Sequence, residues 1–488
     1  MFAEIDQHDI IARLKFDNPW WEDHGVGQVV FQTTPRRKYF ESFYSLVADT
    51  TVRRAIVLMG PRRVGKTVML YHSIRALLDT GVEAASILYV SLETPVYTGL
   101  SLERILGLFQ DLHGHPRHAK LFVFFDEIQY LRNWEVHLKS LVDSYLECRF
   151  IATGSAAAAL RLKSQESGAG RFSDFVLPPL TFAEYLQFIG CEQELIRTLP
   201  HEKHALDVWP YTTTDIHALN AEFINYLNFG GYPEAVFSKT IRENPNQYIK
   251  SDVIDKVLLR DLPSLYGISD IQELNRLFTT LAYNTANEVS PDKLCQSSGV
   301  AKNTVRRYLE YLEAAFLVSR IERIDQNATR FRRALWFKVY LTNPSMRAAL
   351  FGPVTAESKE MGPLTETAVL SQWSHTHITK LYYARWNGGE VDLVHLPTHT
   401  QTPSWATEIK WSDRPYTVRS ELDACVTFAA KHPGIGEEPL VVTSRTVTDN
   451  DVQYRNVRFK FIPASLYVYA IGANLYRNTA RMGGGVDA

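Results

Sequence analysis

The sequence has few cysteines and no strong excess of charge of either sign, and each absence removes a class of protein. The four cysteines in 488 residues stand too far apart for a Cys-x-x-Cys pair, so neither a zinc knuckle nor a disulfide framework is expected. A formal net charge of -2 gives no overall attraction to nucleic acid, so any contact with DNA must depend on local basic patches.

Long apolar runs and repeats are also missing. No stretch approaches the roughly 20 apolar residues of a membrane-spanning helix, and residues 1–6 lack the basic start and apolar core of a signal peptide. We therefore expect a soluble, cytoplasmic protein without a membrane segment. A chain of 488 residues is too long for one hydrophobic core, so more than one domain is expected.

A phosphate-binding loop is predicted at residues 60–67, which read GPRRVGKT and follow the apolar run 55–59. A strand, a glycine-rich turn and a helix starting near Lys66 aim backbone N–H groups and the positive helix end at a triphosphate. Lys66 is expected to reach the β- and γ-phosphates, and the Thr67 hydroxyl to bind Mg²⁺. The alternative is a chance Gly-Lys-Thr in a surface turn. The predicted ATP-binding residues of the loop are Gly60, Pro61, Arg62, Arg63, Val64, Gly65, Lys66 and Thr67.

Acidic residues end a second apolar strand, as a P-loop site requires. Asp126 is predicted to hold the magnesium ion, and Glu127 to polarise the attacking water. The alternative is that Asp126 only caps the next helix. A third apolar strand ends near Thr153 and Ser155, either of which is a candidate sensor of the γ-phosphate.

Strands and helices alternate over residues 30–180, a pattern that predicts a parallel sheet covered on both faces. An additional strand is expected at 86–91, between the P-loop strand and the acidic strand. Together with Glu127, it indicates the additional-strand, catalytic-glutamate branch of P-loop ATPases.

Arg171 is a candidate arginine finger, because it lies in a glycine-rich turn from which it can reach a nucleotide, for example on a neighbouring subunit. The alternative is an exposed arginine that pairs with a nearby acid such as Asp174. Arg161 is a second candidate for the finger.

The middle of the chain is predicted to hold a helical region at 181–265 and a helix-turn-helix at 266–335. The turn FGGYPE at 229–234 is expected to form either a lid over the nucleotide or a joint to the next domain. Lys302, Arg306 and Arg307 would open the second helix of the helix-turn-helix and contact DNA phosphates, although such folds also dock proteins. The basic residues counted in this region are Lys302, Arg306, Arg307, Arg320, Arg323, Arg330, Arg332, Arg333 and Lys338, against the acids Glu310, Glu313, Glu322 and Asp325.

A second acidic constellation is predicted in the last region, where strands and helices alternate again. Asp392 lies on one expected strand, and Glu408 and Lys410 share a face of the next because strand side chains alternate. Two carboxylates and a lysine can hold Mg²⁺ and orient a water for phosphodiester cleavage, with Glu366 completing the metal ligands. The alternative is cross-strand salt bridging on a solvated face.

With these motifs together, the chain resembles the prokaryotic AAA-type ATPases, of the ASCE P-loop branch, that carry a carboxy-terminal DUF4143 domain. The resemblance spans nearly the whole chain and rests on GPRRVGKT, FFDEI, ATGS, GAGRF before LPPLTF, FGGYPEAV, GEVDLV and TEIKW. It implies an α/β fold with a parallel-sheet ATPase domain at 1–180, a helical lid or linker at 181–265, a winged helix at 266–335 and a restriction-endonuclease-like PD-(D/E)xK domain at 336–488.

By this resemblance, Lys66 and Thr67 bind ATP and magnesium, Asp126 binds the metal, and Glu127 is the hydrolytic base. Glu366, Asp392, Glu408 and Lys410 match the endonuclease pattern of a helix acid, a strand aspartate and a Glu-x-Lys pair. Asn343 stands where relatives tend to carry an aspartate after the strand.

The preferred hypothesis is an ATP-hydrolysing, oligomeric motor or switch that acts on DNA, with a magnesium-dependent endonuclease domain. Branched DNA and a hexameric ring are suggested by the resemblance alone. The alternative is a signalling or defence ATPase that engages a protein partner and in which the endonuclease fold is an inactive scaffold. A GTPase is less favoured, because no Asn-Lys-x-Asp guanine-reading motif is present.

Overall fold

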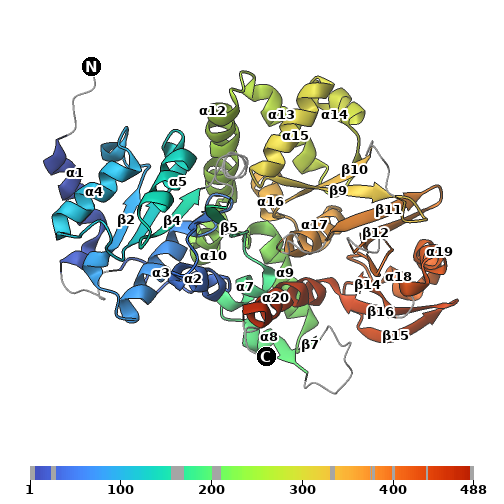
Figure 1. Cartoon of the computed structure of the whole chain (residues 1–488). Coiled ribbons are helices and arrows are strands. Elements are labelled where there is room, and N and C mark those ends of the chain that lie inside the picture. The colour runs from blue at the N-terminus through green and yellow to red at the C-terminus, as the bar shows by residue number, and fades with distance from the viewer. Residues whose placement is uncertain are drawn as a thin grey trace. The chain divides into compact units, whose positions relative to one another are not determined.

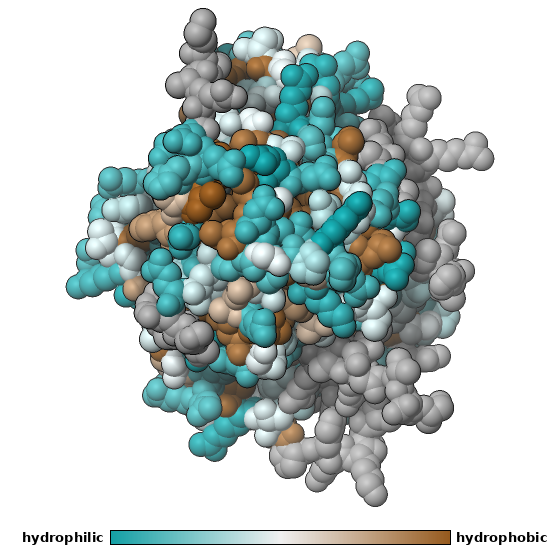
Figure 2. Space-filling view, turned by 60° about the vertical axis from the view of Figure 1, so that its left-hand side comes forward, coloured by the Kyte–Doolittle hydropathy of each residue, from teal (hydrophilic) through white to brown (hydrophobic). Residues whose placement is uncertain are grey.

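The computed structural model forms two compact units, residues 1–178 with 482–488 and residues 179–481, each of which is described by itself (Figure 1). The described residues are 6–22, 29–154, 170–199, 210–329, 336–373, 375, 380–397, 402–435 and 438–483. Figure 2 shows hydrophobic side chains in separate patches among hydrophilic residues on the face that it presents.

The first unit is built on a five-stranded parallel sheet with the strand order β2-β3-β4-β1-β5. Its strands are β1 Ala55–Met59, β2 Ile87–Ser91, β3 Phe122–Asp126, β4 Arg149–Gly154 and β5 Phe172–Val176. Its principal helices are α1 Gln7–Asp17, α2 Phe40–Ala48, α3 Lys66–Asp79, α4 Leu102–His113 and α5 Trp134–Ser144. This architecture confirms the predicted P-loop ATPase fold class.

Most residues of β1 to β4 are buried, because helices cover both faces of the sheet. Side chains of α1, α4 and α5 share one apolar core with Ala55, Val57 and Met59 of β1. Helices α2 and α3 lie on the opposite side of the sheet (Figure 1). All five residues of β1 are therefore fully enclosed, and the sheet is a rigid base for the loops at its ends.

The second unit begins with short helices that precede its sheet. These helices are α7 Phe182–Phe188, α8 Glu192–Leu195, α9 Ile216–Phe229, α10 Pro233–Phe237, α11 Lys239–Glu243, two segments of wider helical turns at Asn246–Asp255 and Val257–Asp261, and α12 Leu262–Tyr266. A small two-stranded sheet pairs β6 Ile196–Thr198 with β7 Tyr211–Thr213. The mostly helical character predicted for 181–265 is thus observed, with the small sheet as an addition.

A nine-stranded mixed sheet forms the rest of the second unit, with the order β15-β16-β14-β13-β12-β11-β9-β10-β8. Its strands are β8 Glu288–Val289, β9 Val318–Ile324, β10 Phe337–Leu341, β11 Leu381–Trp386, β12 Gly389–His395, β13 Trp405–Glu408, β14 Leu440–Ser444, β15 Asp449–Tyr454 and β16 Val457–Pro463. Its helices are α13 Ile271–Tyr283, α14 Pro291–Ser298, α15 Lys302–Ala314, α16 Ser345–Phe351, α17 Met361–Trp373, α18 Arg414–Thr417, α19 Asp423–Lys431 and α20 Ala464–Gly483.

Helices cover both faces of this sheet where its side chains are apolar. Leu393 and Ile409 face a core that α17 and α20 share, whereas Val394 and Val442 face Phe428 of α19. Alternation along β12 thus divides its residues between two cores, as expected of a strand in the middle of a sheet.

The sheet is continuous across the domain boundary that the sequence predicts at residues 335 and 336. Antiparallel pairing joins β8, β10 and β9, and β9 in turn pairs in parallel with β11, where Tyr382 lies opposite Glu322. The helix-turn-helix segment and the carboxy-terminal strands therefore share one hydrogen-bonded sheet. Among the helices of the described ranges, none is long and apolar enough to cross a membrane.

Candidate functional site

The glycine-rich loop lies where the sequence predicts it, between the end of β1 and the start of α3. Helix α3 begins at Lys66, and Gly65 caps its amino end in the left-handed region, with φ of 96°. A Cβ at Gly65 would have no heavy atom within 4 Å, so there is open space beside this residue. Such space beside a helix amino terminus suits a phosphate group.

Gly60 is required by a close approach within the first unit. The backbone N–H of Leu177 donates to the Met59 carbonyl at 2.7 Å, and this bond brings the segment after β5 against the loop. A Cβ at Gly60 would lie 2.1 Å from the Leu177 carbonyl oxygen, a distance that real Cβ atoms do not adopt. The loop therefore has one wall formed by backbone.

Lys66 is folded into the loop that precedes it. Its side chain is buried, and Nζ donates to the carbonyl oxygens of Gly60 at 3.1 Å and Pro61 at 2.8 Å. The ammonium thus lies at the mouth of the loop, where a triphosphate's negative charge would be attracted.

Three hydroxyl groups converge on Asp126 at the end of β3. Its Oδ2 accepts from Thr67 at 2.8 Å and from Tyr89 at 2.9 Å, and its Oδ1 accepts from Thr153. Burial, and then the charge of Glu127, raises the pKa of Asp126, while the hydroxyl donors oppose that rise. The carboxylate is thereby held in one orientation beside Thr67, the other residue expected to bind magnesium.

Glu127 departs from the strand geometry immediately after Asp126. Its backbone is left-handed, with φ of 53°, and its N–H donates to Thr153 Oγ1 at 2.9 Å. The side-chain amide of Gln129 donates to the Glu127 carboxylate. Glu127 is half-buried, and its left-handed turn sets the direction in which its side chain leaves the strand.

Sequence reasoning missed Tyr89 and Gln129 in this site. Tyr89 lies on β2, whose neighbour in the sheet is β3, and only that strand order brings its hydroxyl to Asp126. A polar tyrosine in an otherwise aliphatic strand is the one signal that pointed to it. Ser155 and Arg161, which the sequence also nominates, lie outside the described residues.

Arg171 lies at the end of the first sheet where the parallel strands begin, and the P-loop lies at the other end. Its carbonyl accepts from the N–H of Ala55, the first residue of β1, at 2.9 Å, and its guanidinium pairs with Asp143. The sequence expected an acid such as Asp174 as its partner. A strand of this length spans about 16 Å, so Arg171 cannot reach the P-loop of its own subunit. A finger role is restricted to a neighbouring subunit.

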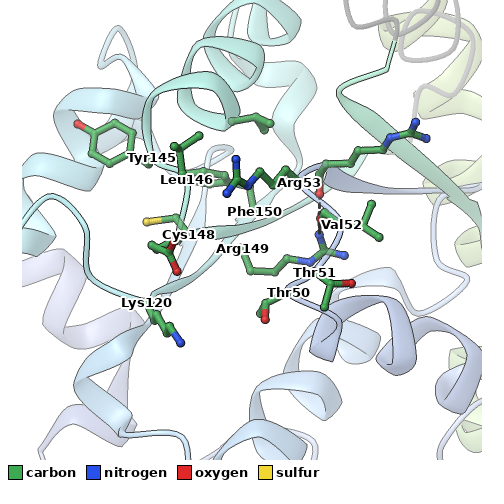
Figure 3. Close-up of a pocket in the computed structure, with 13 residues that line it drawn as sticks. Thr50, Thr51, Val52, Arg53, Lys120, Tyr145, Leu146, Cys148, Arg149 and Phe150 are labelled. Carbon is green, nitrogen blue, oxygen red and sulfur yellow. Dashed lines mark hydrogen bonds between the residues drawn. The ribbon is translucent and has the colours of Figure 1, made fainter.

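A cavity of about 220 Å³ lies at the same end of the sheet as Arg171, at the start of β4 (Figure 3). Arg149 crosses it and donates to the carbonyls of Val52 at 2.6 Å, Arg54 at 2.8 Å and Leu46. Arg149 therefore fixes the segment that enters β1, and the cavity is separate from the phosphate-binding loop.

The basic surface predicted around the helix-turn-helix is smaller than the sequence count indicates. Arg306 and Arg307 are exposed on α15, and Lys302 is exposed but pairs with Asp292 at 2.6 Å. Arg320 pairs with Glu313, and Arg323 pairs with Glu288. Lys338 is buried and was wrongly counted as part of this surface, and Arg330, Arg332 and Arg333 lie outside the described residues.

The turn FGGYPE contacts other residues of the second unit. The N–H of Gly231 donates to Ser345 Oγ at 3.2 Å, and a Cβ there would lie 2.2 Å from the Asn343 side chain. Asn343 Oδ1 also accepts from the N–H of Ser345 at 2.8 Å, so the asparagine holds this turn and the start of α16 together. These contacts favour the interpretation of the turn as a joint.

The second acidic constellation forms a group of buried and half-buried acids that we name the carboxylate cluster. Its members are Glu366 on α17, Glu390 and Asp392 on β12, and Glu408 at the end of β13. Lys410 Nζ lies 2.6 Å from Glu408 and 3.3 Å from Asp392, and the Ile409 N–H donates to Asp392 at 2.9 Å. The structure thus brings together the four residues that the sequence nominated, Glu366, Asp392, Glu408 and Lys410.

Lys338 on β10 is the member that sequence reasoning missed. Its Nζ lies 2.7 Å from Glu390, 3.1 Å from Glu366 and 3.4 Å from Asp392, and only 4% of its side chain is exposed. Although burial opposes its charge, Tyr340 and the surrounding acids raise the pKa of Lys338 well above its ordinary value. The ammonium therefore stays charged inside the cluster.

The carboxylates of the cluster differ in pKa. Burial, followed by the charge of Asp392, raises the pKa of both Glu366 and Glu408 to about 7. Burial acts on Asp392 in the same direction, but Lys410 and Lys338 outweigh it and hold the pKa of Asp392 below its usual range. One carboxylate is thus firmly charged between two that bind protons near neutral pH.

Oxygen atoms of this kind are suitable ligands for Mg²⁺, but their arrangement does not fit the ion. Two ammonium groups lie between the acids, where a cation would have to bind. In the part of the chain that the structure describes, no group of three or more histidine, cysteine, aspartate or glutamate side chains is arranged to hold a metal. The first site does fit its expected ligand, because the loop and the Thr67–Asp126 pair provide the required donors.

Comparison with known proteins identifies two segments. Residues 52–186 match the model of the AAA_14 family, an AAA domain, and residues 220–357 match a domain of unknown function, DUF8612. Neither match covers half of the chain, and the expected DUF4143 domain is not what the second segment matches. The chain carries an AAA-type P-loop ATPase domain, and this domain type supports nucleotide binding.

The proteins whose sequences are similar to this chain are themselves described as uncharacterized. A protein of Haemophilus influenzae is 25% identical over 55% of this chain and 62% of its own length, and two of Methanocaldococcus jannaschii are each 25% identical, over 69% and 55% of this chain and 71% and 57% of their own lengths. The chain thus spans less than two thirds of the first and the third of these relatives.

Among solved structures, the chain is similar to AMPPCP-bound DnaA from Aquifex aeolicus, with 12% identity and a TM-score of 0.26 over 60% of this chain and 92% of that one. It is also similar to C. elegans PCH-2, with 11% identity and a TM-score of 0.27 over 57% of this chain and 66% of that one.

Proposed function

We propose that the first unit binds ATP with Mg²⁺ and hydrolyses it. The observation that carries this proposal is the hydrogen bond of 2.8 Å between Thr67 and Asp126, which lies beside a glycine-rich loop and Lys66. Those are the donors that a P-loop ATPase uses for the nucleotide's phosphates and its metal.

Each residue has a distinct task in this proposal. Lys66 exchanges its bonds to the loop carbonyls for bonds to the β- and γ-phosphates, and the N–H groups at the start of α3 hold the same phosphates. A bound Mg²⁺ supplies positive charge that stabilises the transferred phosphoryl group. Asp126 and Thr67 hold that ion, and Glu127 accepts a proton from the attacking water.

We propose that hydrolysis occurs in a homo-oligomer such as a hexamer. The position of Arg171 supports this proposal. An arginine at the end of the sheet opposite the P-loop can contact only the nucleotide of a neighbouring subunit. The pair with Asp143 is exposed, so its exchange for a phosphate costs little.

DNA is proposed as the partner of the second unit. Helices α13, α14 and α15 with the antiparallel strands β8, β10 and β9 have the element order of a winged helix, in which α15 would enter the major groove. Exposed Arg306 and Arg307 supply positive charge for phosphates. Branched DNA stays a proposal from resemblance alone. The magnesium-dependent cleavage that the resemblance implies for Lys410 and the cluster is not proposed, because two ammonium groups lie where the ion would have to bind.

A protein partner is the second candidate. It is favoured by the small size of the described basic surface, where Lys302, Arg320 and Arg323 are all paired with acids. In this alternative, ATP binding changes the second unit so that it engages a protein, and the endonuclease-like sheet serves as a scaffold.

ATP hydrolysis is tested first, with purified full-length protein and released phosphate as the measurement. Lys66→Ala is expected to reduce turnover by about a hundredfold or more. Glu127→Gln should stop turnover while ATP binding persists, because it removes only the proton acceptor. Lys139→Ala changes an exposed lysine of α5 and is the control. Full turnover in Lys66→Ala would contradict the proposal.

DNA binding is tested by titrating fluorescent duplex, forked and four-way DNA with wild type and with Arg306→Glu/Arg307→Glu. The double change should weaken binding on every DNA by about tenfold or more and reduce its salt dependence. Lys239→Glu, an exposed position on α11, is the control. If the wild type binds none of these DNAs, the protein-partner alternative is retained and the DNA proposal fails.

A further inference from the structure

Lys338 is a buried lysine whose ammonium contacts three carboxylates. It is the second residue of β10, where its backbone lies opposite Ile321 of β9 and Glu288 of β8, so the strand cannot shift without breaking the sheet. Its side chain extends into the interior of the second unit, where the ammonium contacts Glu366, Glu390 and Asp392. Burying an ammonium group costs desolvation free energy, so the contacts that it makes here must offset that cost.

The ammonium lies at the point where the acids converge. Glu366 comes from a helix, and Glu390 and Asp392 come from one face of β12, yet all three place an oxygen within 3.4 Å of the same nitrogen. Tyr340, two residues further along β10, also donates to Glu366, at 3.1 Å. A divalent ion bound by Glu366 and Asp392 would need the volume that this nitrogen fills.

We propose that Lys338 is a built-in cation that keeps divalent metal ions out of the carboxylate cluster. Its single charge and three N–H donors satisfy three carboxylates together, and Lys410 does the same for Asp392 and Glu408. The side chain cannot swing into water, because it is almost completely enclosed. Metal can therefore enter only when this ammonium is removed.

The consequence is that the sheet of the second unit needs no Mg²⁺ to fold and does not cleave DNA as arranged here. Lys338 and the cluster belong to the second unit, so the inference is independent of ATP hydrolysis by the first. A failure of the ATPase proposal would leave it intact, and the converse also holds.

The test is a Mn²⁺ titration of nucleotide-free, full-length protein, with free Mn²⁺ read from its paramagnetic resonance signal. Lys338→Met keeps the chain length and removes the charge, and we expect it to bind one Mn²⁺ about tenfold or more tightly than wild type. Adding Asp392→Asn should abolish that gain. Lys239→Met, an exposed lysine, is the matched control and should behave as wild type.

Two results would overturn the inference. One is a wild type that already takes up one Mn²⁺ and loses it on Asp392→Asn. The other is a Lys338→Met protein with the wild-type circular dichroism spectrum and no gain in Mn²⁺ binding. Should Lys338→Met fail to fold, the comparison of wild type with Asp392→Asn decides alone, since equal and negligible uptake by both is then the supporting result.

Discussion

Thr67 and Asp126 stand 59 positions apart in the sequence, and their side chains share a hydrogen bond of 2.8 Å. Thr67 lies in the first turn of α3, and Asp126 ends β3, so this bond ties the start of the helix that follows the loop to the strand that would supply an acid. Tyr89 and Thr153 hold the same carboxylate from the strands on either side. The acid is thus positioned before any ligand arrives.

Replacing the Thr67 hydroxyl should uncouple magnesium from nucleotide binding. Thr67→Val keeps the shape and removes the donor, so ATP affinity in Mg²⁺ should fall about tenfold, while affinity in EDTA should change little. Thr67→Ser should retain most of the wild-type value. A fluorescent ATP analogue titrated with and without Mg²⁺ gives both numbers, and equal losses in the two conditions would contradict a metal role.

Gly60 should tolerate no side chain. Because a Cβ there would lie 2.1 Å from the Leu177 carbonyl oxygen, Gly60→Ala must push β1 and the segment after β5 apart. We expect a loss of about 2 kcal/mol or more in the free energy of unfolding by urea, together with loss of ATP binding. Gly107→Ala, where a Cβ meets nothing within 4 Å, is the control and should be neutral or slightly stabilising.

Asn18 is expected to stabilise the edge of the first sheet. Its buried side chain accepts from the Tyr89 N–H at 2.6 Å and donates to the carbonyls of Tyr89 at 2.9 Å and Leu14 at 2.8 Å, so it pairs with β2 as a neighbouring strand would. Asn18→Leu should cost about 2–4 kcal/mol in urea unfolding, because buried backbone groups lose their partners. Gln7→Leu removes one exposed bond to Arg104 and should cost about 0.5 kcal/mol or less.

The second unit should become less stable as pH rises through neutrality. Burial raises the pKa of Glu408 from 4.5 to about 7, so the folded state binds this proton more tightly than the unfolded chain does. The resulting stability is present in full below about pH 4.5 and is lost as pH passes about 7. Melting temperatures between pH 5 and 8 should therefore fall more steeply for wild type than for Glu408→Gln. Parallel curves for the two proteins would contradict this assignment.

Local sequence patterns predicted the strand and the helix on either side of the glycine-rich loop. The strand expected at 55–59 is β1, and the helix expected near Lys66 begins there. Glycine-rich turns and apolar runs carry their structural information within a few residues, so no tertiary contact was needed to find them. The acids at the end of β3 were predictable for the same reason.

Contacts that depend on strand order could not be predicted in the same way. The residues near Arg171 do not indicate that β5 pairs with β1. This pairing places the arginine at the end of the sheet away from the P-loop. Lys338 looked like one more basic residue near a helix-turn-helix. Only the joining of β9 to β11 brings its strand into the sheet that carries Asp392.

The unbroken run of hydrogen bonds from β8 to β15 limits how this protein can be dissected. A fragment that stopped at residue 335 would lose β10 and β11, which are both neighbours of β9 in the sheet, and the other fragment would lack β8 and β9. Two such fragments would expose unpaired backbone and aggregate rather than work as independent modules. The cut that respects the architecture falls between Pro178 and Pro179.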